Sequence, residues 1–379
     1  MEAKHSRLIV VVIAAAAAVI PMMLPVRLGA AIASVSVGRQ AAAQASLPLV
    51  YVLSTGGTIA GRGASTTAGS DYERGAVRGE ELVQRVPEIA QYARIKVEQI
   101  ANVYGNDLTL ANWLTLVQRI NLIFAEDSSA AGIVVTHGTN TLEETAFFLN
   151  LTVKHRRPVV VVGAQRPGTA ISADGPANLL GAVRVAIAKD AVGKGVLAVM
   201  NDEINTARDV AKTNTYRPGT FQTPELGFLG YVDQDRVTFY RQPTRRHTAD
   251  AEFDVSGATE LPAVEILYSY VQPSVVPFHA LVGAGVQGIV FAGSGPAGIS
   301  AAERTAIESL DAMPAASRPI IVRASRTGNG RVTDAGPEYR SMKTVTADTL
   351  SPHKARILLM LALMKTRDLA EIRRMFQEY

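Results

Sequence analysis

Short continuous apolar runs recur along the chain, and each one ends at a turn rich in Gly, Ser, Thr or Pro. Their length and lack of polar alternation are typical of parallel strands that are buried on both faces. In the first half of the chain they predict strands over 49–54, 95–100, 132–135, 158–163 and 195–200. Stretches with helical apolar spacing lie between them and predict helices over 80–86, 110–124, 142–153 and 178–189. This alternation indicates right-handed βαβ units and a doubly wound, mostly parallel sheet.

The helix predicted over 110–124 has the clearest one-sided pattern. Asp107 or Thr109 can cap its first turn. Its apolar face is formed by Leu110, Trp113, Leu114, Val117, Ile120 and Phe124. Trp113 lies in the middle of this stripe, so we expect it in the core rather than on a ligand surface.

Residues 241–262 interrupt the pattern, because they are polar and have no sustained apolar period. We interpret them as a linker between two domains. Further strands are predicted over 264–268, 286–292 and 319–324, and a C-terminal helix begins at Ser351-Pro352 and carries apolar residues as far as Leu369. The predicted fold class is therefore α/β. A larger N-terminal domain with a doubly wound, mostly parallel sheet covers 46–240, and a smaller C-terminal α/β domain covers 263–379.

The N-terminus has the pattern of a signal peptide. Lys4 and Arg7 precede an apolar run over 8–24, and Ala-Gln-Ala at 43–45 fits a small-residue cleavage site. We expect residues 1–45 to be removed on export, which places the mature chain in the periplasm or outside the cell. The alternative is an uncleaved anchor, because the run is close to the shortest length that can span a bilayer.

The composition of the chain limits the kinds of site and partner that we expect. The 379 residues are 47% hydrophobic and 19% charged, which is globular composition and enough for two domains. There is no cysteine, and the six histidines are scattered without metal-ligand spacing, so we expect neither a metal nor a cofactor. Residues 1–45 carry four basic side chains and one acidic one, which leaves 34 basic and 33 acidic residues in the mature chain. This balance gives no charge argument for a nucleic acid or a membrane surface as partner.

Three stretches combine glycine, threonine and lysine in a way that favours a reactive site. They are STGGTIA at 54–60, VTHGTNTLEETA at 135–146 and DVAKTNT at 209–215. The first two follow predicted strands, and the carboxyl ends of strands in an open α/β sheet are where ligands bind. A long loop rich in Gly, Ser and Thr, 61–79, follows the first and has the character of a mobile lid. Taken alone, the first stretch is equally compatible with a Gly-rich connection bearing solvent-facing threonines.

Hydroxyl and lysine side chains together can carry out nucleophilic catalysis through a covalent intermediate. A covalent route needs a nucleophile, a base that takes its proton and donors for the oxyanion. The chain has no thiol and no GxSxG motif, so a threonine activated by a lysine of lowered pKa is the natural candidate.

At these three stretches the chain resembles the bacterial L-asparaginase family, in its secreted type II branch. The resemblance extends from about residue 49 to 379, and it implies the roles. Thr58 matches the primary nucleophile, Thr139 the second catalytic threonine, Lys212 the lysine that supports it and Tyr72 the tyrosine of the closing loop. Backbone N–H groups near Gly57, Gly138 and Thr139 are then candidates for the oxyanion.

Three neighbouring residues are expected to be structural instead. Glu143 and Glu144 fit the first turn of a helix, where carboxylates stabilise the helix dipole. His137 fits a hydrogen-bonded core histidine. Lys212 alone could be a solvated lysine, and only the other two motifs favour a catalytic role.

The chain departs from the family where the amino-acid groups of the substrate are bound. The family has aspartate directly after the second threonine, whereas this chain has Asn140. The serine and glutamine or glutamate of the α-carboxylate site correspond to Gly105 and Asn106. The glutamate that the second domain provides to a neighbouring subunit corresponds to Gly336. We therefore expect the substrate-binding set Gly57, Gly105, Asn106, Gly138 and Asn140 either to bind an amino acid more weakly than the family does or to use a different polar partner.

The resemblance implies an amidohydrolase that converts L-asparagine to L-aspartate and ammonia. It leaves open whether L-glutamine is also a substrate. It further implies a homotetramer with sites shared between subunits. Two alternatives are a non-catalytic periplasmic protein that binds amino acids or amides, and an amidotransferase subunit that supplies ammonia to charged tRNA. The predicted export and the absence of a basic patch in the sequence disfavour the amidotransferase subunit.

Overall fold

The computed structural model describes residues 46–67, 71–334 and 336–379. The predicted signal peptide, residues 1–45, therefore lies outside the described residues. Residues 47–379 form one compact unit that contains two separate main sheets. Within the described ranges, no helix has the length and apolar character needed to cross a membrane.

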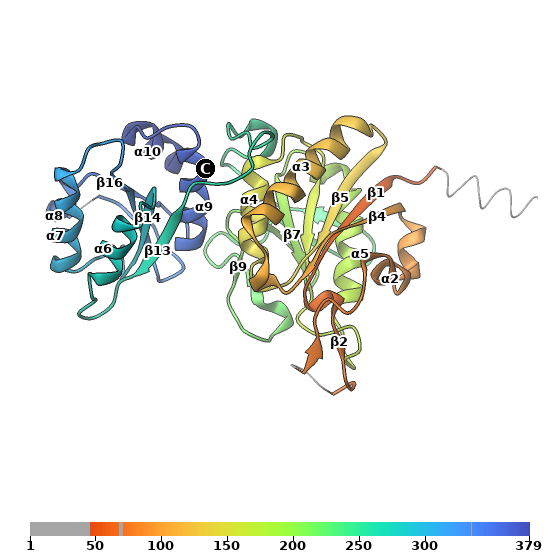
Figure 1. Ribbon diagram of the computed structural model, residues 1–379. Helices are drawn as coiled ribbons and strands as arrows, with labels where there is room; N and C mark the ends of the chain where they lie inside the picture. Colours follow the sequence, from red (N-terminus) through yellow and green to blue (C-terminus); the bar gives the residue numbers. More distant parts are fainter. Residues whose placement is uncertain (1–45, 68–70, 335) are drawn as a thin grey trace, which may run out of the picture. The chain divides into compact units, whose positions relative to one another are not determined.

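The larger sheet has eight strands in the order β12-β11-β8-β7-β6-β5-β1-β4 (Figure 1). Its five strands from β7 to β4 are parallel, and β8, β11 and β12 extend it in antiparallel fashion. The strands are β1 (Leu49–Gly56), β4 (Arg94–Val103), β5 (Ala130–Thr136), β6 (Val159–Val162), β7 (Val196–Met200), β8 (Glu203–Thr206), β11 (Gly230–Val232) and β12 (Val237–Phe239). The predicted mostly parallel sheet is confirmed, whereas the three antiparallel strands were not predicted.

Helices cover both faces of this sheet. One face carries α3 (Leu110–Glu126) and α4 (Leu142–Thr152), and the other carries α2 (Gly79–Gln84) and α5 (Gly175–Ala186) (Figure 1). Strand β1 shows why its sequence has no polar alternation. Leu49, Tyr51 and Leu53 pack into the core beneath α3 and α4, and Val50 and Val52 pack into the core beneath α2 and α5.

The structure places Trp113 in the core, as predicted. It is buried, its ring stacks on Phe148 with centroids 5.0 Å apart, and its Nε1 donates to Thr145 Oγ1 at 2.8 Å. Thr109, rather than Asp107, caps the helix, because its hydroxyl accepts from the backbone N–H of Asn112.

The smaller sheet has four parallel strands in the order β13-β14-β15-β16. The strands are β13 (Val264–Tyr268), β14 (Gly288–Gly293), β15 (Ile320–Ser325) and β16 (Thr344–Thr346). One face packs against α6 (Val276–Gly283) and α7 (Ala301–Ser309), and the other against α9 (Pro352–Leu363) and α10 (Leu369–Glu378); a short helix, α8 (Pro337–Arg340), precedes β16. The domain boundaries at 240 and 263 stay a prediction.

The C-terminal helix differs from its prediction. The sequence pattern was interpreted as one helix that continues to Leu369, but α9 ends at Leu363 and α10 begins anew. Asp368 causes the new start, because its side chain accepts from the backbone N–H of Glu371. Helix α9 also packs against α4, so one core continues from the larger sheet to the smaller one.

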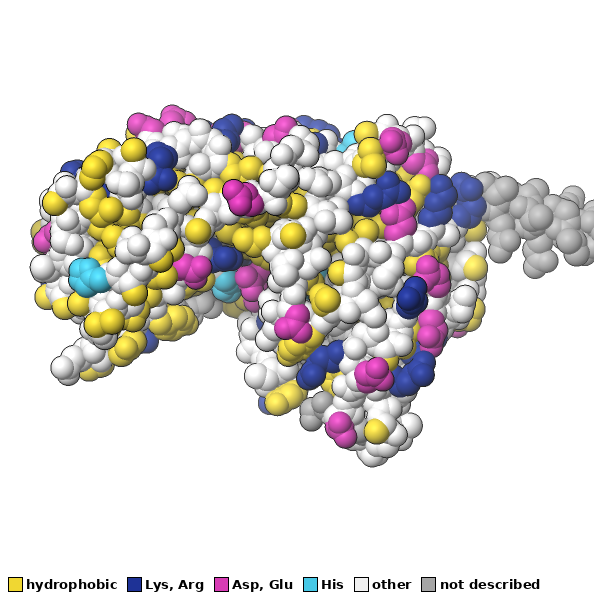
Figure 2. Space-filling view, viewed as in Figure 1, with side chains coloured by type: hydrophobic (Ala, Val, Ile, Leu, Met, Phe, Trp, Pro, Cys, Tyr) yellow, Lys and Arg dark blue, Asp and Glu magenta, His cyan; other side chains and the backbone are white. Residues whose placement is uncertain are grey.

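Two short hairpins complete the description. β2 (Arg62–Gly63) pairs with β3 (Tyr72–Glu73) inside the segment that was predicted as a loop, 61–79. β9 (Ala211–Lys212) pairs with β10 (Phe221–Gln222). On the face seen in Figure 2, basic and acidic side chains are interspersed, as the nearly neutral charge of the predicted mature chain leads us to expect.

Candidate active site

Two glycine turns form the floor of the site. β1 and β5 are adjacent parallel strands, so the turns that follow them lie at the same edge of the sheet. Gly56 and Gly57 have φ angles of 101° and 84°, in the left-handed region that favours glycine. A Cβ at Gly57 would lie 2.2 Å from the Cα of Gly138. The backbones of the first two motifs therefore touch, and only glycine allows this contact.

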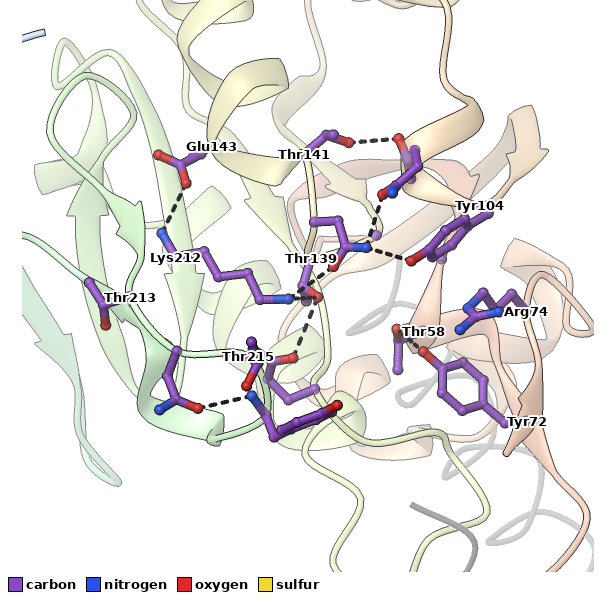
Figure 3. A pocket seen from close by; sticks show the side chains of 18 residues that line it. Thr58, Tyr72, Arg74, Tyr104, Thr139, Thr141, Glu143, Lys212, Thr213 and Thr215 are labelled. Atoms are coloured by element: carbon purple, nitrogen blue, oxygen red, sulfur yellow. Dashed lines mark hydrogen bonds between the residues drawn. The ribbon is translucent and has the colours of Figure 1, made fainter. Parts of the chain in front are cut away.

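A cavity of about 880 Å³ opens above this floor (Figure 3). All the residues predicted for the site line it: Gly57, Thr58, Tyr72, Gly105, Asn106, Gly138, Thr139, Asn140 and Lys212. The structure thus brings together residues that are far apart in the sequence. Their chemical roles stay predictions.

The first reactive pair joins β3 to the turn after β1. Thr58 Oγ1 and the Tyr72 hydroxyl are 2.6 Å apart (Figure 3). Thr58 is 7% exposed, so its hydroxyl is largely shielded from water and has the tyrosine as a fixed partner. This arrangement allows a proton to move between the two oxygens.

The second pair joins the turn after β5 to the β9–β10 hairpin. Lys212 Nζ donates to Thr139 Oγ1 at 2.9 Å and to Asn140 Oδ1 at 3.1 Å. Partial burial lowers the pKa of Lys212, although the charge of Glu143 opposes the shift. A lysine whose pKa is lowered can take a proton from a hydroxyl that it contacts.

Glu143 holds the backbone of Lys212 in place. Its Oε1 accepts from the Lys212 backbone N–H at 3.0 Å, and its Oε2 lies 3.0 Å from His353 Nε2 and 3.7 Å from Lys354 Nζ. Burial alone would raise the pKa of Glu143, but the hydrogen bond from His353 and the charge of Lys354 lower it to about 2. Glu143 occupies the first turn of α4, as expected for a helix-dipole residue, and also connects Lys212 to helix α9.

His137 holds the turn that follows β5 through hydrogen bonds. It is fully buried, its Nδ1 lies 2.7 Å from the Gly138 carbonyl oxygen, and its Nε2 lies 2.9 Å from Thr145 Oγ1. The carbonyl oxygen can only accept, so Nδ1 carries the proton and Nε2 is the acceptor. Burial lowers the pKa of His137 to about 4, so the ring is neutral at pH 7. These contacts fit the predicted structural role.

The third group of lining residues consists of amides and tyrosines. Asn140 Nδ2 donates to the Tyr104 hydroxyl at 2.6 Å and to Asn106 Oδ1 at 2.9 Å. The carbonyl of Gly105 accepts from Thr141 Oγ1 at 2.8 Å. The residues predicted for substrate binding thus bind one another across the turns that follow β4 and β5.

The sequence interpretation missed several lining residues. They are Arg74, Tyr104, Thr141, Gln165, Thr213, Asn214, Thr215 and Tyr216. Arg74 is two positions after Tyr72, and its guanidinium lies 4.4 Å from the ring centre of Tyr104 and 5.1 Å from that of Tyr72. Its position close to the predicted lid tyrosine is the sequence signal that could have identified Arg74 as a lining residue.

The fold is α/β, and one cavity at the edge of its larger sheet gathers hydroxyl side chains and a lysine. The family description "Asparaginase, N-terminal" matches residues 49–245, and "Glutaminase/Asparaginase C-terminal domain" matches 263–376. The chain belongs to the asparaginase family, whose members hydrolyse amides.

Three similar proteins illustrate the relationship. L-asparaginase 2 of Bacillus subtilis is 48% identical over 334 residues, which cover 88% of this chain and 87% of that protein. The probable periplasmic L-asparaginase of Haemophilus influenzae is 44% identical over 336 residues, which cover 88% and 94%. The crystal structure of a probable cytoplasmic L-asparaginase from Campylobacter jejuni has a TM-score of 0.83 and 43% identity, over 88% of this chain and all of the other.

Proposed function

We propose that the protein hydrolyses L-asparagine to L-aspartate and ammonia at this cavity. The observation that carries the proposal is the hydrogen bond from Lys212 Nζ to Thr139 Oγ1, which faces the same cavity as the Thr58–Tyr72 pair (Figure 3). Two activated hydroxyls in one cavity are what a two-step hydrolysis needs. The non-catalytic alternative has no support from the relatives.

In the first step Thr58 Oγ attacks the amide carbon. The Thr58 proton passes through the Tyr72 hydroxyl toward the leaving nitrogen, the C–N bond breaks, and ammonia leaves. The product is an ester between Thr58 and the acyl group. Backbone N–H groups of the touching glycine turns, at Thr58 and Thr139, are the donors at hand for the oxyanion.

In the second step a water molecule attacks this ester. Thr139, deprotonated toward the neutral amine of Lys212, takes the proton of the water. The new C–O bond forms, the bond to Thr58 breaks, and the Thr58 oxygen takes up the proton that Lys212 had accepted, which returns Lys212 to its neutral amine. The cycle releases one acid and one ammonia for each amide and water consumed.

L-glutamine is a second candidate substrate. The description of the C-terminal domain names glutaminases as well as asparaginases. Side-by-side kcat/KM values for the two amides decide between a strict asparaginase and a dual enzyme.

The direct test is ammonia release from L-asparagine by the purified protein and by Thr58→Ala. Turnover that disappears in the variant while its melting temperature is unchanged supports the proposal. Unchanged turnover in Thr58→Ala removes the nucleophile assignment.

We also infer export and assembly, which rest on the sequence resemblance. The names of the relatives point to both the periplasm and the cytoplasm, so the basis for export is the N-terminal pattern. N-terminal sequencing of the exported protein tests cleavage near residue 45. Full activity of a proven monomer would refute the shared-site homotetramer.

A further inference from the structure

The charged side chains around the cavity are unbalanced. Among the described residues that line it, only Arg74, Lys212 and Glu143 carry an ionisable acid or base that is charged at neutral pH. Arg74 is exposed and stacks on Tyr104 and Tyr72, and none of the described carboxylates forms an ion pair with it. Its guanidinium therefore faces the cavity with an unused charge (Figure 3).

The single acid is already occupied. One oxygen of Glu143 accepts from the Lys212 backbone, and the other contacts His353 and Lys354. Its side chain is only 10% exposed. Glu143 is therefore not free to pair with an ammonium group of a ligand.

Neighbouring acids do not correct the balance. Glu73 and Asp107 adjoin lining residues in sequence, but both are exposed and neither lines the cavity. The amide oxygens are also occupied: Asn140 Oδ1 accepts from Lys212, and Asn106 Oδ1 accepts from Asn140. Each oxygen can accept a second hydrogen bond, but a neutral amide does not compensate the charge of an ammonium group.

The charged side chains that face the cavity and are not held in other contacts are positive whether Lys212 is protonated or neutral. With Lys212 protonated the cavity has two cations, Arg74 and Lys212, and Glu143, which already contacts Lys354, offsets the second only in part. With Lys212 neutral it keeps Arg74, because a guanidinium does not lose its proton in a protein. A carboxylate is attracted in either state, and an ammonium is repelled.

We propose that the site prefers primary amides that carry a carboxylate and no positive charge on the same short chain. Succinamate, which is asparagine without its α-amino group, is the simplest member, and N-acylated asparagine is another. Arg74 binds the carboxylate, while Thr58 and Thr139 face the amide. This inference rests on the proposed amide hydrolysis and names its substrate class.

The size of the cavity supports the same class. At about 880 Å³ it is far larger than a free amino acid, so an uncharged acyl group on the nitrogen can be accommodated. An N-acyl group also removes the charge that the cavity does not neutralise.

The test compares four amides by ammonia release from the purified protein. They are succinamate, N-acetyl-L-asparagine, L-asparagine and 3-aminopropanamide, which has the amine but no carboxylate. We expect kcat/KM for succinamate to exceed that for L-asparagine by about tenfold, the size of one charged contact, with 3-aminopropanamide the poorest. A kcat/KM for L-asparagine equal to or above that for succinamate overturns the inference but supports the proposed function. No ammonia from any of the four overturns the proposed function itself.

Two substitutions test which residues determine the preference for succinamate over L-asparagine. Asn140→Asp adds a carboxylate and should raise the ratio of asparagine to succinamate kcat/KM about tenfold. Arg74→Gln should lower kcat/KM for succinamate about tenfold and leave that for 3-aminopropanamide unchanged or higher. Arg78→Gln is the matched control, because Arg78 is exposed and does not line the cavity. Equal losses on all four amides in Arg74→Gln would overturn the role given to this arginine.

Discussion

The two sides of the cavity differ in how they are built. On the hydrolytic side, Thr58 and Tyr72 form one close pair, and Thr139 and Lys212 form another. On the recognition side, Asn140, Asn106 and Tyr104 bind one another through neutral groups, and the charge comes from Arg74. The first side keeps the residues that the family resemblance implies, and the second replaces them. We therefore expect bond cleavage and substrate choice to be separable properties of this cavity.

Removal of the Thr58 hydroxyl should have the largest effect. We expect Thr58→Ala to lower kcat by about 10⁴-fold or more for every amide, because it removes the hydroxyl that forms the ester in the proposed mechanism. Steady-state ammonia release measures it. Thr67→Ala, on an exposed part of the same segment, is the matched control and should keep full activity. A loss confined to one substrate would place Thr58 on the recognition side instead.

Lys212→Met should have the next largest effect, since it removes the base but keeps the length of the chain. We expect kcat to fall about 10³-fold while KM changes little. In the wild type, activity should rise with pH as Lys212 loses its proton, with a midpoint below the ordinary lysine value of 10.5 because burial lowers its pKa. If the variant has a higher KM and an unchanged kcat, Lys212 has a role in substrate binding instead.

Glu143→Gln tests the link between the hydrolytic side and helix α9. The pKa of Glu143 is about 2 in the folded protein and 4.5 is its ordinary value, so its contribution to stability is full above pH 4.5 and is lost as the pH falls toward 2. The wild type should therefore lose about 3 kcal/mol more than the variant over this window. Urea unfolding at several pH values measures the difference. Parallel curves for wild type and Glu143→Gln would contradict the shift, and exposed Glu80→Gln should give the wild-type curve.

Tyr104→Phe should have the smallest effect. It removes one neutral hydrogen bond to Asn140 and keeps the ring on which Arg74 stacks. We expect KM to rise about fivefold, which corresponds to about 1 kcal/mol, with kcat unchanged. A larger fall in kcat than rise in KM would show that the two sides of the cavity are coupled after all.

Much of the fold could be predicted because buried parallel strands have a simple signature. The runs over 49–54 and 158–163 correspond to β1 and β6, and the stripe around Trp113 corresponds to α3. The antiparallel strands β8, β11 and β12 have only three or four residues each, which is too short for an apolar period. The end of α9 depends on the capping side chain of Asp368, which the periodicity does not contain.

The site could be predicted where a motif or the resemblance to the family names its residues, as for Tyr72, Gly105 and Asn106 outside the three motifs. Thr58, Thr139 and Lys212 lie in motifs, and the structure places them around one cavity. Arg74 and Tyr104 lie in no motif, and they meet because β3 and the turn after β4 approach each other in space. His353 lies 210 positions from Glu143, so only a three-dimensional structure reveals their contact.

The contact between Gly57 and Gly138 limits how this protein can be redesigned. Any side chain at Gly57 would meet the opposite main chain, and no second substitution at Gly138 could make room, since the obstacle is backbone. Libraries that vary the floor will therefore yield misfolded chains rather than new specificities. Variation directed at the rim, through Arg74, Tyr104, Asn140 and Tyr216, can change which amide is accepted while the floor stays intact.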